Sequence, residues 1–345
     1  MRKARWLVTW KDSKKKPVFY HCIGRVVERR FVFGDEEKEK FRTFMRMYEN
    51  FSGCRVASYC LMSNHFHLLL EVPPKPESGI SDEVFLKRLS ALYSEAFVAG
   101  VAAELAEARA EGAETRVEEI FSRFTYRMND LTQFMKGLLQ RFTQWFNGRH
   151  KRKGRLWEDR FKSVIVESGI AARTMAAYID LNPVRAGIVS DPADYRWCGY
   201  GEAMGGGKKG NGKKAREGLV RACLSDEGTG YDAEKWQEVS RKYRQLMGMA
   251  LEKKRGKFSS TRKGSHESKG EFLPAPGVAA MMRHRVRYFT DGAVIGGKEF
   301  VNGVFEACRD RFSEKRKDGA RKLRGQASAA AGVLWSARDL RVGIG

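Results

Sequence analysis

The sequence has few cysteines, and their spacing forms no known motif. Six cysteines are scattered along 345 residues, with no C-x-x-C pair among them. This excludes a zinc ribbon and argues against a disulfide framework, because both depend on closely or regularly spaced cysteines. We therefore expect reduced, structural thiols at Cys22, Cys54, Cys60, Cys198, Cys223 and Cys308.

Long apolar runs are also absent. No stretch approaches the ~18 uncharged apolar residues that a membrane span needs. The opening sequence MRKARWLVTWKDSKKK has an apolar segment too short, and too soon followed by charge, for a signal peptide. With 42% apolar and 11% aromatic residues, the composition is that of a globular protein with one large or two ordinary domains. We expect a cytoplasmic protein with no membrane partner.

Acidic residues are fewer than basic ones. The chain has 65 Lys and Arg against 42 Asp and Glu, a formal net charge of +23. Such an excess points to a polyanionic partner, nucleic acid first, and hence to nucleoid association, although it can also be a solubilising surface. The charge is clustered in residues 141–163, where Trp145, Phe146, Trp157 and Phe161 are interleaved with it. The basic residues of this cluster are Arg141, Arg149, Lys151, Arg152, Lys153, Arg155, Arg160 and Lys162.

Basic side chains bind phosphates, and aromatic rings stack on unpaired bases. We therefore expect residues 149–162 to form a DNA-binding basic loop that includes Trp157. Trp145 and Phe146 can equally belong to the core.

The order of apolar patterns predicts an α+β fold. Strands are expected at residues 19–27, 55–62, 65–72 and 161–167, with helices at 35–51, 131–146 and from near Ala171. This is the β-α-β-β-α-β order of a ferredoxin-like antiparallel sheet with helices on one face, followed by one more helix.

The rest of the chain is expected to surround a core domain at residues 1–200. A helical insertion at about residues 76–128 is rich in Ala, Glu and Leu and can be a lid, an arm or inert. Residues 201–275 combine two Gly- or Lys-rich linkers, near 201–218 and 253–270, with a helical region between them. Residues 276–345 form a small helical tail. Its Asp-Gly turn and apolar spacing fit a helix-turn-helix DNA reader, but also two ordinary short helices.

Two histidines stand at the start of an otherwise apolar strand in YCLMSNHFHLLLEV, at residues 59–72. Because side chains alternate across a strand, His65 and His67 share one face while Phe66 and Leu68 lie on the other. The pair can hold a metal, or it can be a half-exposed surface pair.

A tyrosine and an amide are spaced by one helical turn in AARTMAAYIDLNPVRAG, at residues 171–187. Tyr178 and Asn182 would then lie on one helix face. A single helical tyrosine is usually a packing residue. Here it accompanies two histidines on one strand face and a basic loop just before it.

Four motifs in this order resemble the single-tyrosine HUH transposases of the IS200/IS605 type, and most closely the REP-associated tyrosine transposases. They are YHCIGRVVERRFVF, YCLMSNHFHLLLEV, GRLWEDRFKSVIVES and YIDLNPVRAGIV, which together cover about residues 17–200. The resemblance implies a single-stranded DNA endonuclease and strand transferase that cuts near hairpins or palindromic repeats, as a monomer or homodimer.

The same resemblance assigns roles to individual residues. His65 and His67 would hold a divalent metal, Mg²⁺ or Mn²⁺, and Tyr178 would be the nucleophile that forms a 5′-phosphotyrosine. Asn182 stands where many family members have Gln, and it would complete the metal site with a side chain one methylene shorter. Two alternatives remain open: a catalytically silent DNA- or RNA-binding regulator, and a metal-dependent hydrolase that uses water and does not need Tyr178.

Overall fold

The computed structural model describes residue 7 and residues 16–205, 211–225, 233–249, 277–282, 287–291, 293–327 and 332–337. Four strands form the centre: β1 (Val18–Arg25), β2 (Arg55–Leu61), β3 (His65–Val72) and β4 (Lys162–Val166). They lie side by side in the order β2-β3-β1-β4, and each pair is antiparallel. This is the ferredoxin-like order, so the predicted fold class is confirmed.

Two long helices cover one face of this sheet. They are α1 (Asp35–Ser52), between β1 and β2, and α5 (Leu131–Arg149), between β3 and β4. Phe41 of α1 contacts both Phe142 of α5 and Phe66 of β3, each with 5.0 Å between ring centroids. Gly24 on β1 faces the same ring, and a Cβ there would come within 2.4 Å of Phe66. Only glycine therefore fits at this position.

The opposite face is covered by helices from later in the chain. They are α6 (Ile170–Asp180), α8 (Gly199–Gly205), α9 (Asn211–Leu224) and α10 (Ala233–Leu246), with the short α7 (Asn182–Arg185) directly after α6. Leu219, Val220 and Cys223 of α9 are fully buried in the main core. The prediction of a flexible linker over residues 201–218 is thus wrong at residues 201–205, which belong to α8, and again from residue 211 onward. The predicted linker near 253–270 lies outside the described residues.

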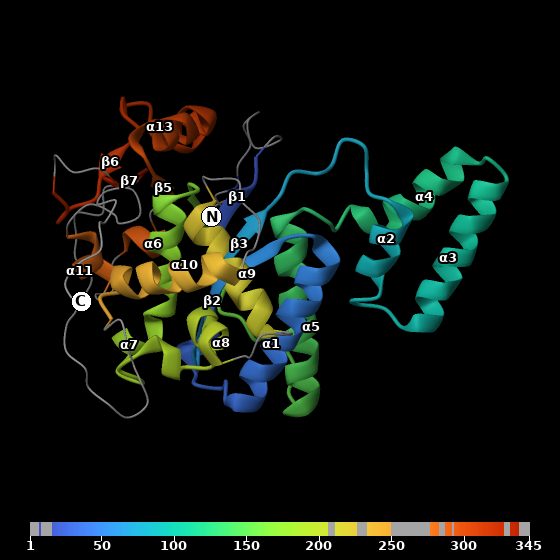
Figure 1. Cartoon of the computed structure of the whole chain (residues 1–345), viewed down its shortest axis with the longest axis horizontal. Helices are drawn as coiled ribbons and strands as arrows, with labels where there is room; N and C mark the ends of the chain where they lie inside the picture. The colour runs from blue at the N-terminus through green and yellow to red at the C-terminus, as the bar shows by residue number, and fades with distance from the viewer. Residues whose placement is uncertain are drawn as a thin grey trace.

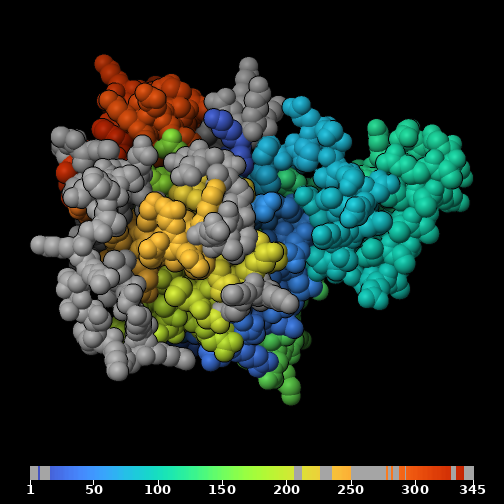
Figure 2. Space-filling model, viewed as in Figure 1, coloured from blue at the N-terminus to red at the C-terminus, as the bar shows by residue number. Residues whose placement is uncertain are grey.

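The helical insertion projects from one side of the molecule (Figures 1 and 2). It consists of α2 (Asp82–Leu89), α3 (Glu95–Ala110) and α4 (Glu114–Thr125). Ser81 and Ser94 cap the first two helices by accepting hydrogen bonds from backbone N–H groups. Phe85, Leu105 and Ile120 belong to a hydrophobic cluster separate from the main core, to which α1 contributes Phe51.

The C-terminal region extends the central sheet. β5 (Val294–Gly296) pairs parallel with β4, and β7 (Trp335–Ser336) then joins β5 to β6 (Arg321–Lys322). α11 (Val278–Met282) and α12 (Tyr288–Asp291) precede β5, and α13 (Lys298–Ala307) lies between β5 and β6. A strand therefore stands where a helix-turn-helix was expected, so that interpretation is wrong for this segment. The Asp-Gly sequence precedes a sheet strand and not a recognition helix.

Two compositional expectations are also tested by the fold. All six cysteines are buried thiols, and none forms a disulfide. Within the part of the chain that the structure describes, no helix has both the length and the apolar composition that crossing a membrane requires.

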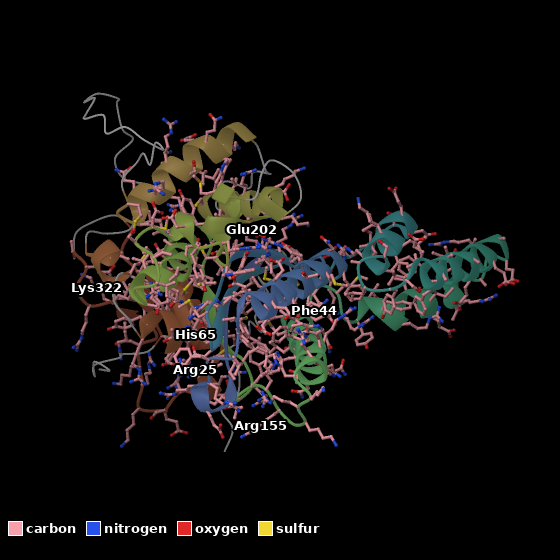
Figure 3. The ribbon with its side chains drawn as sticks, turned by 90° about the horizontal axis from the view of Figure 1, so that it is seen from below. Arg25, Phe44, His65, Arg155, Glu202 and Lys322 are labelled. Carbon is pink, nitrogen blue, oxygen red and sulfur yellow. The ribbon has the colours of Figure 1, made fainter. Side chains whose placement is uncertain are left out.

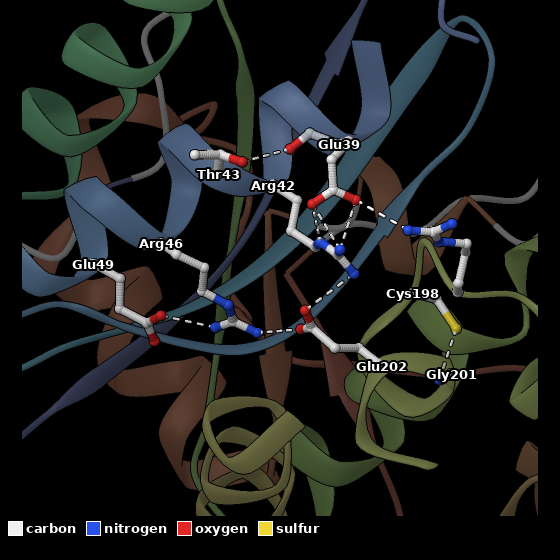
Figure 4. Close-up of polar contacts among 9 residues, drawn as sticks. Glu39, Arg42, Thr43, Arg46, Glu49, Cys198, Gly201 and Glu202 are labelled. Atoms are coloured by element: carbon white, nitrogen blue, oxygen red, sulfur yellow. Dashed lines mark hydrogen bonds and ion pairs between the residues drawn. The ribbon is translucent and has the colours of Figure 1, made fainter. Parts of the chain in front are cut away.

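A buried ion network fastens α1 to α8 (Figure 4). The Arg46 guanidinium lies 2.5 Å from a Glu202 carboxylate oxygen and 2.7 Å from one of Glu49. Arg42 approaches the second Glu202 oxygen at 3.3 Å. Arg46 and Glu202 are 5% and 4% exposed, so water screens their charges little.

Replacing Glu202 with Gln is expected to destabilise the chain by about 3 kcal/mol, since a buried guanidinium then loses one of its two carboxylates. Glu107→Gln is the control, because its ion pair with Arg116 lies on the exposed insertion and should contribute under about 1 kcal/mol. Urea unfolding of both variants measures the difference. Equal, small losses would contradict a structural role for this network.

Candidate active site

The two histidines lie on one face of β3, as the strand pattern predicts. The ring centroids of His65 and His67 are 5.1 Å apart. In the β1–β3 pairing Arg25 lies opposite His65 and Ile23 opposite His67. His21, two residues further along β1, therefore shares this face with both histidines. Its ring centroid is 5.0 Å from that of His67.

Hydrogen bonds fix the position of the proton on His21 and His67. His21 Nδ1 lies 2.8 Å from the carbonyl oxygen of Phe289. A carbonyl only accepts, so His21 Nδ1 carries the proton and Nε2 carries the lone pair. His67 Nδ1 lies 2.8 Å from that Nε2 and must donate to it. The lone pair of His67 is therefore on Nε2.

His65 is oriented in the same sense by its neighbour. Its Nδ1 lies 2.7 Å from Asn64 Oδ1, while Asn64 Nδ2 donates to the carbonyl oxygen of Arg29 at 3.0 Å. The amide oxygen of Asn64 thus accepts from His65 Nδ1–H, and the lone pair of His65 also lies on Nε2. Both histidines present the nitrogen that binds metals in the deprotonated form.

The surroundings keep the rings of His67 and His21 neutral. Burial lowers the pKa of His67 well below its usual range, and the neighbouring His21, His65, Arg185 and Arg25 lower it further. Burial also lowers the pKa of His21 to about 4, against the hydrogen bond to Phe289. Neutral imidazoles are the form that binds a metal, and the positive charges of Arg25 and Arg185 favour a phosphate.

Tyr178 lies on α6 beside the histidines. Its ring centroid is 6.5 Å from that of His67 and 6.4 Å from that of His21. Phe289 of α12 stacks on the phenol ring at 4.5 Å, and the Arg185 guanidinium of α7 lies 4.0 Å from the ring centroid. Tyr178 is only 2% exposed. The structure thus brings the predicted nucleophile to the histidines but covers it.

Asn182 begins α7, one residue after α6 ends. Leu181 between them has φ and ψ of −78° and −1°, which keeps the chain close to helical across the junction. Pro183 in the first turn of α7 accounts for the break in the helix, because it donates no backbone hydrogen bond. The Asn182 amide nitrogen is buried without a hydrogen-bond partner.

The chemistry of His65, His67 and Asn182 suits a divalent cation. No group of three His, Cys, Asp or Glu residues in the described ranges could hold a metal. The two histidines present lone pairs on Nε2, however, and rotating the Asn182 amide by 180° puts an oxygen at its partnerless position. Two imidazoles and one amide oxygen would leave further coordination positions for water and phosphate.

The basic loop lies at the same end of the sheet as His65. Leu156 accepts a hydrogen bond from Val27 N–H, and Arg25 accepts one from Glu158 N–H. Figure 3 shows Arg25 beside His65, with Arg155 on the loop beyond them. The predicted basic residues therefore stand next to the histidine site.

Individual loop residues differ in how they are held. Lys151, Lys153 and Arg155 are exposed, whereas Arg152 stacks its guanidinium on Phe146 at 5.6 Å. Two other residues that were predicted to contact DNA form ion pairs with acidic residues. Arg149 pairs with Glu36 at 2.9 Å, and Lys162 pairs with Asp291 at 3.2 Å. Arg160 is exposed and has a partner of its own.

Trp157 has a different place from the one predicted. Its indole N–H donates to Thr143 Oγ1 at 3.0 Å, and its ring contacts those of Phe33 and Phe66 at 5.9 and 5.4 Å. The ring is therefore partly buried and packs against the core beneath the loop. Phe146 and Phe161 are likewise core residues, at 2% and 5% exposure.

The sequence did not identify His21, Arg185 or Phe289 as site residues. His21 could have been predicted as a site residue, since strand alternation and a β1–β3 pairing place it on the face that carries His65 and His67. Arg185 follows Tyr178 by seven residues, which is two helical turns. Phe289 had no such signal, because 268 residues separate it from His21 and only the fold brings them together.

Comparison with known families gives a match that covers the strands of this site but not its helices. Residues 14–93 match the family model described as Transposase IS200 like. The IS200-like match contains β1, β2 and β3, with His21, His65 and His67, and it ends before Tyr178. The match covers the part of the chain that carries the first two of the four motifs.

Two further comparisons are less informative. A search of curated proteins gives no match. Among solved structures, the chain is similar to one described as a REP-associated tyrosine transposase bound to a REP hairpin. The sequences are 11% identical, the TM-score is 0.37, and the similarity covers 59% of this chain and 90% of that one. A TM-score of this size supports no inference about function.

Proposed function

We propose that this chain is a transposase-like, metal-dependent tyrosine nuclease that cuts single-stranded DNA near hairpins and transfers the cut strand. The observation that carries the proposal is the shared geometry of β3 and α6. Two histidines with lone pairs on Nε2 lie on one strand face, and the ring of His67 approaches Tyr178, the only tyrosine of the fourth motif.

The residues that would hold Mg²⁺ or Mn²⁺ are His65, His67 and Asn182. When bound, such a cation supplies Lewis acidity toward the scissile phosphate and offsets charge on the departing oxygen. The deprotonated Nε2 atoms serve this purpose without a change in protonation. A phenol is a weak nucleophile near neutral pH, so Tyr178 depends on this activation of the phosphate.

In the proposed step, Tyr178 Oη attacks the phosphorus of a phosphodiester. A bond forms between Oη and phosphorus, the bond from phosphorus to the 3′ oxygen breaks, and the phenol proton is transferred to that oxygen. The products are a 5′-phosphotyrosine on Tyr178 and a free 3′-hydroxyl. Attack by a 3′-hydroxyl reverses the step and rejoins strands, so ATP is not required.

The cover over Tyr178 must open before this chemistry. Phe289 stacks on the phenol ring, and Tyr178 is 2% exposed. A phosphate can reach Oη only when the covering residues move. We propose that α12, which carries Phe289, moves when DNA binds.

The same burial favours one alternative, a DNA- or RNA-binding regulator that no longer cuts. In such a protein Tyr178 would be a packing residue between Phe289 and Arg185, and the net charge of +23 would serve binding alone. The hydrogen bonds that fix both histidine tautomers favour the enzyme, since a binding protein has no need of aligned Nε2 lone pairs. In either case we propose hairpin or palindromic single-stranded DNA as the partner and the nucleoid as the location.

Tyr178→Phe removes only the hydroxyl group and should abolish cleavage, because the nucleophilic oxygen is lost. Hairpin affinity should stay within a few-fold of wild type, since Lys and Arg contacts to phosphates dominate binding. The assay incubates the protein with labelled hairpins from the DNA flanking its gene and Mn²⁺, and follows cleavage and the covalent adduct on a denaturing gel. Tyr195→Phe is the control, because Tyr195 is a buried tyrosine that bonds the Leu61 carbonyl.

Two results would contradict the proposal. Cleavage by Tyr178→Phe without an adduct would identify the hydrolase that uses water. The absence of any adduct with wild-type protein on all flanking hairpins would favour the binding-only regulator.

The basic loop generates a separate expectation. Replacing Lys151, Lys153 and Arg155 by Gln should weaken hairpin binding and reduce its salt dependence by up to about two units of slope, at ~0.7 per single-strand phosphate contact. Arg149→Gln is the control, since Glu36 already neutralises that charge. Binding titrations over a range of salt concentrations give both slopes. An unchanged slope in the triple variant would leave this loop a solvated surface.

A further inference from the structure

His21 connects the histidine pair to the C-terminal region. It is fully buried, it lies outside the strand that carries the predicted ligands, and both of its ring nitrogens have partners. Its Nδ1–H donates to the carbonyl oxygen of Phe289, and its Nε2 accepts from His67 Nδ1–H. The order of donors and acceptors along this chain is fixed by the carbonyl, which cannot donate.

We infer that His21 is a positioning residue that holds His67 in the tautomer and orientation needed to bind the metal through Nε2. The inference rests on the proposed metal site and deepens it. Metal-binding histidines usually donate their second nitrogen to a carboxylate, a carbonyl or water. Here a second imidazole takes that place and is itself anchored by a backbone carbonyl.

The alternative is that His21 merely fills the core. Burial of an imidazole among apolar groups would require only that its polar atoms find partners. A packing role predicts that any replacement of similar size and stability preserves metal binding. A positioning role predicts that metal binding follows the hydrogen bond to His67 and not the volume of the side chain.

Three variants separate these roles. His21→Gln can accept from His67, since its amide oxygen reaches the position of Nε2. His21→Asn is shorter by one methylene, so it retains a donor for Phe289 and loses the bond to His67. His21→Phe keeps the ring volume and loses both bonds. His150→Phe is the matched control, because His150 bonds to Glu37 and not to the site.

The measurement is the Kd for Mn²⁺ of the DNA-free whole chain, by calorimetry, with thermal unfolding of each variant alongside. We expect His21→Asn and His21→Phe to weaken Mn²⁺ binding about 10- to 100-fold, and His21→Gln and His150→Phe to stay within a few-fold of wild type. Nitrogen NMR of the metal-free protein should show the proton of His67 on Nδ1 in wild type and in His21→Gln.

The outcomes distinguish this inference from the function on which it rests. If His67→Ala abolishes Mn²⁺ binding while His21→Asn binds like wild type, the positioning role is overturned and the metal site stands. If wild-type protein binds no Mn²⁺ at all, the metal site itself is overturned. Should His21→Phe fail to fold, the comparison of Gln with Asn decides the question.

A second inference comes from a different place in the molecule. A cavity of about 800 Å³ lies between the end of α1, the start of β2, α2 of the insertion and α9. We call it the basic cavity, because five cationic side chains line it: Arg55, Lys87, Arg88, Lys214 and Arg221. Arg55 lies opposite Glu71, six residues along β3 from His65, which corresponds to ~20 Å at 3.3 Å per residue.

Cationic side chains outnumber acids in the lining of this cavity by five to two, although the Glu217 carboxylate also acts on Arg221. Its two acids pair with residues outside it, Glu49 with Arg46 at 2.7 Å and Glu217 with Lys213 at 3.8 Å. Among the five cations only Arg221 has an ion pair with a residue that the structure describes, to Glu71 at 2.6 Å.

Arg88 shows how the site is built. Its guanidinium lies against Gly53, where a Cβ would come within 2.7 Å, and its Nη1 lies 3.5 Å from Met128 Sδ. These neutral contacts fix the guanidinium without compensating its charge. Burial lowers the pKa of Arg88, and the positive charge of Arg55 lowers it further, against the effect of Cys54.

We propose that the basic cavity binds phosphates of the DNA strand at a distance from the cut, so that the insertion and the core grip the nucleic acid together. The triple change Arg55→Gln, Lys87→Gln and Lys214→Gln should reduce the salt slope of hairpin binding by up to about two units, at ~0.7 per contact. The control changes Arg109, Arg116 and Arg123 to Gln, since acids on the same insertion already pair with them.

An unchanged slope in the cavity variant, or an equal fall in the control, would overturn this proposal. Tighter binding of poly-glutamate than of DNA would also overturn it, in favour of an acidic protein partner. The test is independent of the chemistry at Tyr178, because the slope is measured without cleavage.

Discussion

The antiparallel register of β1 and β3 is the constraint on which the site depends. Ile23 lies opposite His67 and Arg25 opposite His65, which turns His21 toward the same face. A shift of one residue would turn His21 to the face of α1 and α5 and break its bond to His67. Packing secures the register from the other side, since Gly24 leaves room for the Phe66 ring and the apolar alternation of β3 requires that face to be buried.

The C-terminal region completes what the sheet begins. Phe289 provides a carbonyl that fixes the His21 tautomer and a ring that covers Tyr178. The same residue therefore organises the proposed metal ligands and blocks the proposed nucleophile. Movement of α12 to admit DNA would affect both, so that the arrangement of the histidines and access to Tyr178 are coupled in this fold. The family match over residues 14–93 does not reach this region.

Much of this fold was predictable, because periodic patterns mark its elements. The alternation in residues 65–72 and the helical spacing from Leu131 to Phe146 located β3 and α5, and the order of elements gave the sheet. The predictions that failed concern elements that form only because of their tertiary contacts. Residues 211–218 contain Gly and Lys, typical of linkers, yet they begin a helix whose later residues pack on β2. Val294–Gly296 is too short to show a strand pattern and is a strand only because β4 offers a free edge.

The site residues divide in the same way, into those that a sequence motif marks and those that only the fold brings together. His65, His67 and Tyr178 were predicted as site residues because each stands in a motif. The structure places the His67 ring 5.1 Å from that of His65 and 6.5 Å from that of Tyr178. Trp157 was assigned to DNA because aromatic residues among basic ones look alike whether they stack on bases or on Phe33 and Phe66. Phe289 could not have been assigned, since its role arises from a contact between distant segments.

We propose that His65 and His67 bind one divalent cation through Nε2. Pulsed electron paramagnetic resonance of Mn²⁺ bound to the whole chain tests this directly, because nitrogen nuclei of bound imidazoles modulate the electron spin echo. The account predicts modulation from two imidazole nitrogens in wild-type protein and from one in His65→Ala. Bound Mn²⁺ with no imidazole modulation, or the same modulation in His65→Ala, would contradict it.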